Sequence, residues 1–302
     1  MTLPRRIVPG MTVMVTRRTQ GRTHLLRPDP AIRKLFTYCL AVAAERHRIA
    51  VHAAVLMSTH EHLIVTDVAG SLPRFLHELH RLMALGVKAL RSWPGSVWDG
   101  RKTSVVELRT PQAIVEKLAY VMANPVSAGL VRRASQWRGV MTLPAQIGRA
   151  RWQASRPSQF FSSRSRRWPP SATLQLTVPP ALDLTEEETC AVVARELEQL
   201  EREARTRALR EGRTVRPRGR RAGHESAYRR ATTAEERGTL NPVFAVGRGQ
   251  AAALIEARTL LKTFWNAHRA AMARWRSGDR SALFPHGTWL MHCLHGATRA
   301  TA

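Results

Sequence analysis

Hydrophobic residues in the first half of the chain fall into short strand-like runs and longer stretches with helical spacing. Ile32 to Arg46 and Leu72 to Leu90 carry apolar residues three and four positions apart, which predicts two amphipathic helices. We expect strands over four short runs: Met11 to Thr16, Val51 to Met57, His60 to Thr66 and Ser104 to Leu108. Thr110-Pro111 is expected to begin a further helix over Ala113 to Met122, which Pro125 ends nearby.

The predicted order is β-α-β-β-α-β followed by a helix. This order is typical of the ferredoxin-like arrangement, so we expect an α+β fold with an antiparallel sheet and its helices on one face. Farther along, Thr185 and Glu188 form a capping box for a helix to Arg210, and Gln250 to Trp275 has the spacing of another helix.

The composition changes abruptly after the first half. Residues 148–182 are rich in Arg, Ser and Pro, which predicts a linker. We therefore divide the chain into a first domain over 1–147, this linker, and a mostly α-helical C-terminal extension over 183–302 whose role the sequence leaves open.

The chain is strongly basic. Its 48 Lys and Arg against 22 Asp and Glu give a net charge of +26, spread over both halves, which favours a polyanionic partner such as nucleic acid. An arginine-rich proteome is the alternative explanation. The basic run Arg213 to Arg221 is either a nucleic-acid contact or a disordered linker.

The remaining composition points to an intracellular protein. Cys39, Cys190 and Cys293 fit neither a zinc pattern nor a disulfide scaffold. No stretch approaches the roughly 20 apolar residues of a membrane span, and no apolar signal core follows Arg5-Arg6. We expect a cytoplasmic, nucleoid-associated protein without a membrane partner.

Two pairs of residues suggest chemistry. His60 and His62 point to the same side of a strand, so they can form half of a metal site. Tyr120 and Asn124 lie four apart in a predicted helix and share one helical face, so a nucleophile and a third ligand can face the histidines. Each pair also has a simpler explanation: exposed polar positions for the histidines, and a helix end for Asn124 before Pro125.

Three stretches resemble the single-tyrosine HUH transposases, especially the REP-associated tyrosine transposases. They are Met57-Ser58-Thr59-His60-Glu61-His62-Leu63, the run Leu118-Ala119-Tyr120-Val121-Met122-Ala123-Asn124-Pro125-Val126-Ser127-Ala128-Gly129-Leu130-Val131, and Ala134-Ser135-Gln136-Trp137. The second stretch is the most specific. The resemblance covers residues 10–145, less than half of the chain.

The resemblance implies an enzyme that cleaves and rejoins single-stranded DNA, at hairpins. His60, His62 and Asn124 then bind a divalent metal, Mg²⁺ or Mn²⁺. Tyr120 attacks a phosphodiester, becomes joined to the 5′ end of the DNA and releases a 3′ hydroxyl. A homodimer in which the helix carrying Tyr120 serves the partner subunit is left open.

Physical chemistry is consistent with these roles. Two imidazoles and an amide oxygen make a mixed nitrogen and oxygen site with open positions. A phenol, with a pKa near 10, is a slow nucleophile unless a metal or cation lowers that value. Lys117, three residues before Tyr120, can do so or hold the scissile phosphate, although a solvated lysine is the simpler interpretation.

Glu61 departs from the family pattern, in which the middle residue of the histidine motif is bulky and apolar. Strand alternation points Glu61 to the opposite face of the sheet, where a carboxylate is costly unless paired. It can instead reach solvent or an arginine such as Arg17, or assist the metal indirectly. It does not make a His-Glu-x-x-His site, because Ile64 stands where the second histidine is needed.

Other functions remain as competitors. A replication-initiator-type HUH nickase shares the chemistry, whereas a relaxase usually places its tyrosine before the histidines. A domesticated descendant that binds DNA hairpins without cutting them is the competitor that is not an enzyme.

Overall fold

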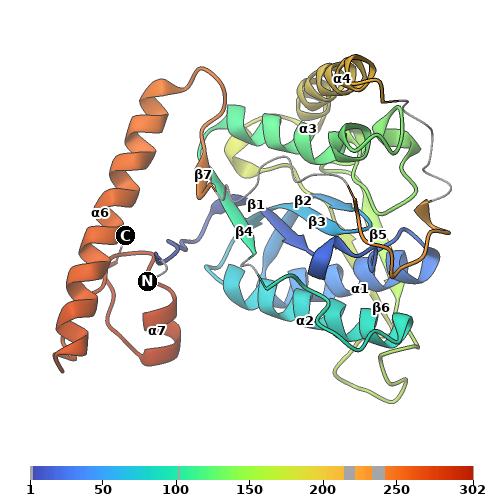
Figure 1. Cartoon of the computed structure of the whole chain (residues 1–302). Helices are drawn as coiled ribbons and strands as arrows, with labels where there is room; N and C mark the ends of the chain where they lie inside the picture. Colours follow the sequence, from blue (N-terminus) through green and yellow to red (C-terminus); the bar gives the residue numbers. More distant parts are fainter. Residues whose placement is uncertain (1–2, 101–102, 214–221, 233–241, 302) are drawn as a thin grey trace.

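The computed structural model describes residues 3–100, 103–213, 222–232 and 242–301 (Figure 1). Its strands are β1 (Met11–Arg18), β2 (Ile49–Leu56), β3 (His60–Asp67), β4 (Ser104–Leu108), β5 (Arg151–Ser155), β6 (Ser171–Gln175) and β7 (Phe244–Ala245). Its α-helices are α1 (Pro30–His47), α2 (Leu72–Arg91), α3 (Pro111–Ser127), α4 (Glu186–Arg210), α6 (Ala251–Arg276) and α7 (Leu290–His295). Short 3-10 turns lie at Gln20–Arg22, Ala134–Gln136, Pro144–Gln146 and Pro180–Leu182. The predicted strands and helices are present, with ends that differ by a few residues.

The central sheet has the strand order β2-β3-β1-β4-β7. Neighbouring strands from β2 to β4 are antiparallel, whereas β7 pairs with β4 in parallel. The expectation of a wholly antiparallel sheet is therefore wrong at one edge. The extra strand comes from the C-terminal extension, far from β4 in sequence, so no local pattern could reveal the pairing.

Helices cover both faces of the sheet (Figure 1), which corrects the prediction of helices on one face. Val13 and Val65 point toward α1 and α2, while Met14 and Ile64 lie in a second core beneath α3. The apolar residues are consecutive along these strands, because each strand is buried on both faces. This second core positions α3, and therefore Tyr120, over the sheet.

The segment 148–182 is more than a linker. It contains the hairpin of β5 and β6, which packs on α1 and buries Leu174 and Leu176. Tyr38 of α1 donates a hydrogen bond of 2.7 Å to the carbonyl oxygen of Pro169. The linker prediction missed this hairpin, because the alternating apolar residues of β6 lie between Arg- and Ser-rich stretches. The proposed domain boundaries themselves stay a prediction.

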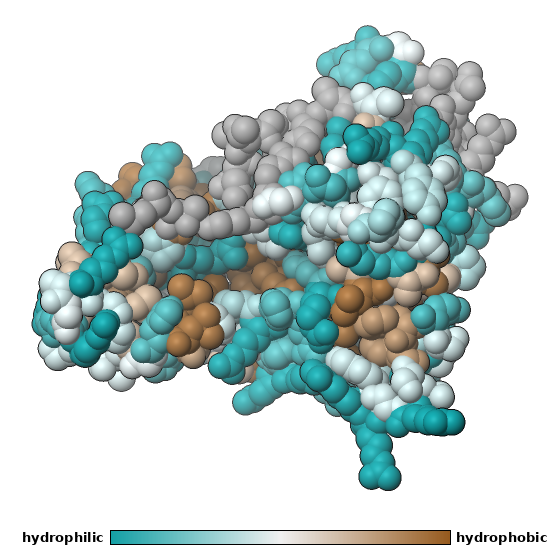
Figure 2. Space-filling view, turned by 60° about the horizontal axis from the view of Figure 1, so that its bottom comes forward, coloured by the Kyte–Doolittle hydropathy of each residue, from teal (hydrophilic) through white to brown (hydrophobic). Residues whose placement is uncertain are grey.

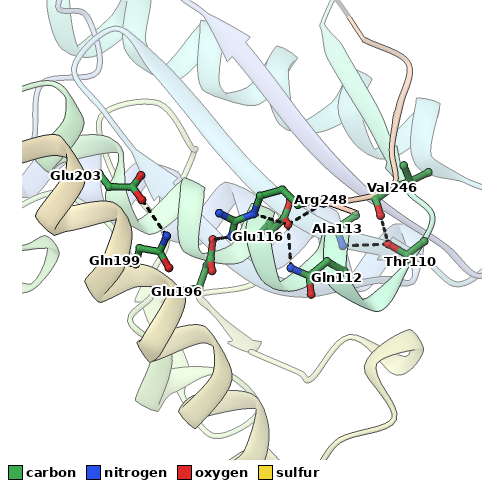
Figure 3. Close-up of polar contacts among 9 residues, drawn as sticks. All are labelled: Thr110, Gln112, Ala113, Glu116, Glu196, Gln199, Glu203, Val246 and Arg248. Atoms are coloured by element: carbon green, nitrogen blue, oxygen red, sulfur yellow. Dashed lines mark hydrogen bonds and ion pairs between the residues drawn. The ribbon is translucent and has the colours of Figure 1, made fainter. Parts of the chain in front are cut away.

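The extension is attached to α3, the helix that carries Tyr120. Helix α4 packs on α3, and its capping box at Thr185 and Glu188 is present as predicted. Figure 3 shows Arg248 between two carboxylates, Glu116 of α3 and Glu196 of α4. The backbone N–H and the Nε atom of Arg248 donate to Glu116 at 2.9 and 3.0 Å. One arginine thus joins the end of β7 to both helices.

Helices α6 and α7 lie to one side of the sheet, next to the N-terminal segment (Figure 1). Trp265 of α6 donates to the carbonyl oxygen of Pro4, and Trp289 donates to that of Gly70, both at 3.0 Å. Hydrophilic residues cover most of the face drawn in Figure 2. Within the described residues, no helix has both the length and the apolar character needed to cross a membrane. Residues 214–221 of the basic run lie outside the described residues.

Candidate active site

The two histidines of the motif lie side by side at the start of β3. Their ring centroids are 4.8 Å apart, with an interplanar angle of 83°. The Nδ1 atom of His62 lies 2.8 Å from the Thr16 hydroxyl, and that of His60 lies 3.0 Å from the Thr59 hydroxyl. Hydroxyl groups therefore orient both rings through Nδ1, and Nε2 is the atom of each ring that would bind a metal.

The electrostatic environment keeps His60 neutral. Burial lowers the pKa of His60 to about 4, and the positive charges of Arg18 and Arg22 act in the same direction, while a hydrogen bond with Asn124 opposes them. A neutral imidazole is the form that binds metal ions. At neutral pH this ring is ready to act as a ligand.

Helix α3 brings Tyr120 and Asn124 to these histidines. The rings of Tyr120 and His62 have centroids 6.0 Å apart at 75°. Asn124 hydrogen-bonds His60 with its side chain and donates from Nδ2 to the carbonyl oxygen of Tyr120 at 3.2 Å. The Nζ atom of Lys117 lies 5.2 Å from the Tyr120 ring centroid. All five residues singled out in the sequence are therefore neighbours.

The end of α3 differs from the prediction. Pro125 does not end the helix, which continues to Ser127, and the N–H of Ala128 donates to the carbonyl oxygen of Asn124 at 2.9 Å. Proline removes only its own N–H, and the residues after it still donate backward. Asn124 thus lies inside the last turns of the helix, one turn beyond Tyr120, rather than at its end.

Glu61 points away from the site. Its carboxylate is fully buried on the opposite face of the sheet, where Oε1 lies 2.7 Å from Nε2 of His80 on α2. The expectations that it reaches solvent or assists the metal are wrong, because β3 alternation turns it toward α2. The expectation that Glu61 reaches an arginine such as Arg17 agrees with the structure, since burial lowers the pKa of Arg17 and the negative charge of Glu61 opposes that shift.

The donor set suits a divalent cation. His60, His62 and Asn124 supply two imidazole nitrogens and an amide oxygen, a neutral set that leaves the charge of a metal available to a phosphate. Among the described residues, no group of three or more His, Cys, Asp or Glu side chains is arranged for a metal. The fit therefore depends on Asn124 as the third ligand.

Sequence reasoning missed three contributors. Thr16 faces His62 through the pairing of β1 with β3, and Arg18 pairs with His60 in the same register. Arg22 follows in the turn after β1 and also acts on His60. Strand alternation could have placed Thr16 on the histidine face once β1 and β3 were known to be neighbours.

No protein-family model matches the chain, and a comparison with functionally characterised proteins finds no match. Among solved structures, the chain is similar to a REP-associated tyrosine transposase bound to a REP hairpin. That similarity has 18% sequence identity and a TM-score of 0.39, and it covers 45% of this chain and 79% of the other. A proposed transposase from Deinococcus radiodurans R1 is similar at 17% identity and a TM-score of 0.27, over 32% of this chain and 76% of the other. Because the sequence identities and TM-scores are this low, the activity has to be inferred from the residues of the site.

Proposed function

We propose that the protein cleaves and rejoins single-stranded DNA, with a DNA hairpin as the natural substrate, through a 5′-phosphotyrosine at Tyr120. The observation that carries this proposal is the meeting of His60 and His62 from β3 with Tyr120 and Asn124 from α3. The antiparallel order β2-β3-β1-β4 supports a ferredoxin-like assignment for this part of the fold.

Cleavage exchanges one phosphoester bond for another at the same phosphorus. The Tyr120 oxygen attacks the phosphorus, the bond from phosphorus to the 3′ oxygen breaks, and the phenolic proton leaves while the 3′ oxygen gains a proton and becomes a hydroxyl. The covalent ester retains the energy of the broken bond, so a 3′ hydroxyl can reverse the step without a nucleotide cofactor. When bound, a divalent metal such as Mg²⁺ or Mn²⁺ polarises the phosphoryl oxygens.

The chain's own residues hold these groups in place. Thr16 and Thr59 orient the imidazoles, and Asn124 connects His60 to the backbone of Tyr120. Lys117 places a cation over the phenol ring, where it stabilises a developing phenolate. The phosphodiester needs such charge neutralisation together with an in-line nucleophile.

The decisive experiment is a covalent-adduct assay with a labelled hairpin oligonucleotide. The wild type should form a protein–DNA adduct that survives denaturing electrophoresis and disappears with a chelator. Tyr120→Phe should form none. Tyr38→Phe is the matched control, because Tyr38 is buried beside Pro169, and it should retain the adduct. Hairpin binding without an adduct in the wild type would instead support the non-cleaving descendant.

A further inference from the structure

Part of the C-terminal extension, residues 222–232, is hydrogen-bonded to the loop that follows β1. The backbone N–H of His24 donates to the carbonyl oxygen of Arg229 at 2.8 Å, and that of Ala231 donates to the carbonyl oxygen of Arg22 at 3.1 Å. Arg27 adds a side-chain bond of 2.6 Å to the carbonyl oxygen of Glu225. Figure 1 shows this segment on the side of the molecule opposite α6.

The loop under this segment also contacts the turn that leads into His60. The N–H of Thr19 donates to the carbonyl oxygen of Thr59 at 2.8 Å, and that of Leu26 donates to Ser58 at 3.0 Å. Arg22, within the loop, acts electrostatically on His60. A single loop, the one that follows β1, therefore separates residues 222–232 from the candidate active site.

The segment forms an aromatic pair with the end of α2. The rings of Tyr228 and Trp93 have centroids 5.6 Å apart and are inclined by 40°. The Tyr228 hydroxyl donates to the carbonyl oxygen of Arg91, and Trp93 Nε1 donates to that of Ser96 at 3.0 Å. Tyr228 is nevertheless 54% exposed. Two aromatic rings are thus held in fixed positions while one remains open to solvent.

Two cations follow Tyr228 directly in the chain. Arg229 and Arg230 follow Tyr228 and are exposed. The Arg230 guanidinium lies across the backbone at Gly21, where its Nε would be 3.4 Å from an added Cβ, next to Arg22. Aromatic faces beside cations are the combination that binds single-stranded nucleic acid, because every base can stack and every phosphate is attracted.

We propose that Tyr228 and Trp93 form a stacking site for an unpaired base of single-stranded DNA next to the active site, with Arg229 and Arg230 contacting its phosphates. This inference rests on the proposed function for the choice of DNA as ligand. It gives residues 222–232 a role in selecting substrates that carry an unpaired strand beside the hairpin. A segment that merely tied the extension to the first domain would not distinguish a base from a bare sugar-phosphate.

The test compares two fluorescein-labelled hairpins by anisotropy. One has a short thymidine tail, and the other has an equally long tail of abasic sites. The wild type should bind the thymidine tail about tenfold more tightly, as expected for one stacked base. Trp93→Ala and Tyr228→Ala should each remove most of this preference. Tyr228→Phe, which keeps the ring and loses the hydroxyl bond to Arg91, should retain it.

Matched controls separate this site from the general basic surface. Trp275→Ala alters an aromatic residue on α6 that Arg280 covers, and it should leave the preference unchanged. Arg230→Ser should weaken binding to both tails and reduce its salt dependence, whereas Arg258→Ser on α6 should do neither. Equal binding of the two tails by the wild type would overturn the inference, and so would a preference that survives Trp93→Ala. The Tyr120 adduct, measured on a hairpin without a tail, reports separately on the proposed function.

Discussion

Glu61 and His80 form a buried pair across one face of the sheet, with 2.7 Å between Oε1 and Nε2 and no solvent exposure of Glu61. His80→Leu should lower the free energy of unfolding by about 3 kcal/mol, because it leaves a buried carboxylate without its partner. Urea denaturation measures this change. The double variant Glu61→Leu/His80→Leu should recover most of the loss. A double variant less stable than His80→Leu alone would contradict this account.

The same pair shows how far sequence reasoning reached. Strand alternation placed Glu61 opposite His60 and His62, which the structure confirms. It could not supply His80, because the rotation of α2 about its axis is set by packing against the sheet.

The candidate site was predictable for a related reason. Residues two apart in a strand, or four apart in a helix, share one face, and these local rules placed His60 beside His62 and Tyr120 beside Asn124. The meeting of the pairs depends on α3 crossing the sheet, which the resemblance supplied and the pattern did not. Residues 222–232 carry no periodic signal, so their position beside the loop after β1 could not be anticipated.

Replacing Gly139 should also destabilise the folded protein. A Cβ atom there would lie 2.3 Å from Nε1 of Trp137 and 2.7 Å from the carbonyl oxygen of Leu56. The same two groups are joined by a hydrogen bond of 3.1 Å. Gly139→Ala should therefore lower the free energy of unfolding by about 1–3 kcal/mol, measured by urea denaturation. Gly100→Ala is the matched control, since an added Cβ meets nothing within 4 Å, and its stability should stay near the wild-type value.

Arg248 should contribute more than an ordinary surface cation. It lies between Glu116 and Glu196, whose side chains are 16% and 15% exposed, although its own side chain is 58% exposed. Burial alone would raise the pKa of Glu116, but hydrogen bonds from Arg248 and Gln112 lower it below its usual range.

Arg248→Ala should cost about 1 kcal/mol of unfolding free energy, because two largely buried carboxylates lose their shared cation and the exposure of the arginine limits the effect. Arg202→Ala removes an exposed pair with Glu198 on α4 and should cost no more than about 0.5 kcal/mol. Thermal or urea denaturation of the two variants side by side measures the difference. Equal losses would show that the bridge between α3 and α4 adds nothing.

His52 should make the protein less stable in acid. Its Nδ1 donates to the carbonyl oxygen of Thr177 at 2.9 Å, and burial lowers its pKa to about 4 despite that bond. Between pH 6.5 and 4 the unfolded chain binds a proton at this residue and the folded protein does not. The contribution of neutral His52 to the free energy of unfolding is therefore fully present above pH 6.5 and is lost as the pH decreases toward 4.

The size of this effect follows from the difference between the two pKa values. Each pH unit between them corresponds to about 1.4 kcal/mol, so His52 should account for a loss of about 2–3 kcal/mol between pH 7.5 and 4.5. In His52→Gln the loss over this range, measured by urea denaturation at both pH values, should be smaller by that amount. His60 titrates alike in both proteins, so the comparison isolates His52. An unchanged pH dependence in the variant would refute the assignment.

Lys117 provides the sharpest test of the chemistry at Tyr120. With Nζ 5.2 Å from the ring centroid, its charge stabilises a phenolate more than a phenol. Lys117→Gln should slow adduct formation about tenfold, because a partly desolvated cation beside the ring contributes on the order of 1–2 kcal/mol. Single-turnover assays measure the rate, and Lys262→Gln on the exposed side of α6 is the charge-matched control. An adduct rate in Lys117→Gln equal to that of the wild type would contradict this role for Lys117.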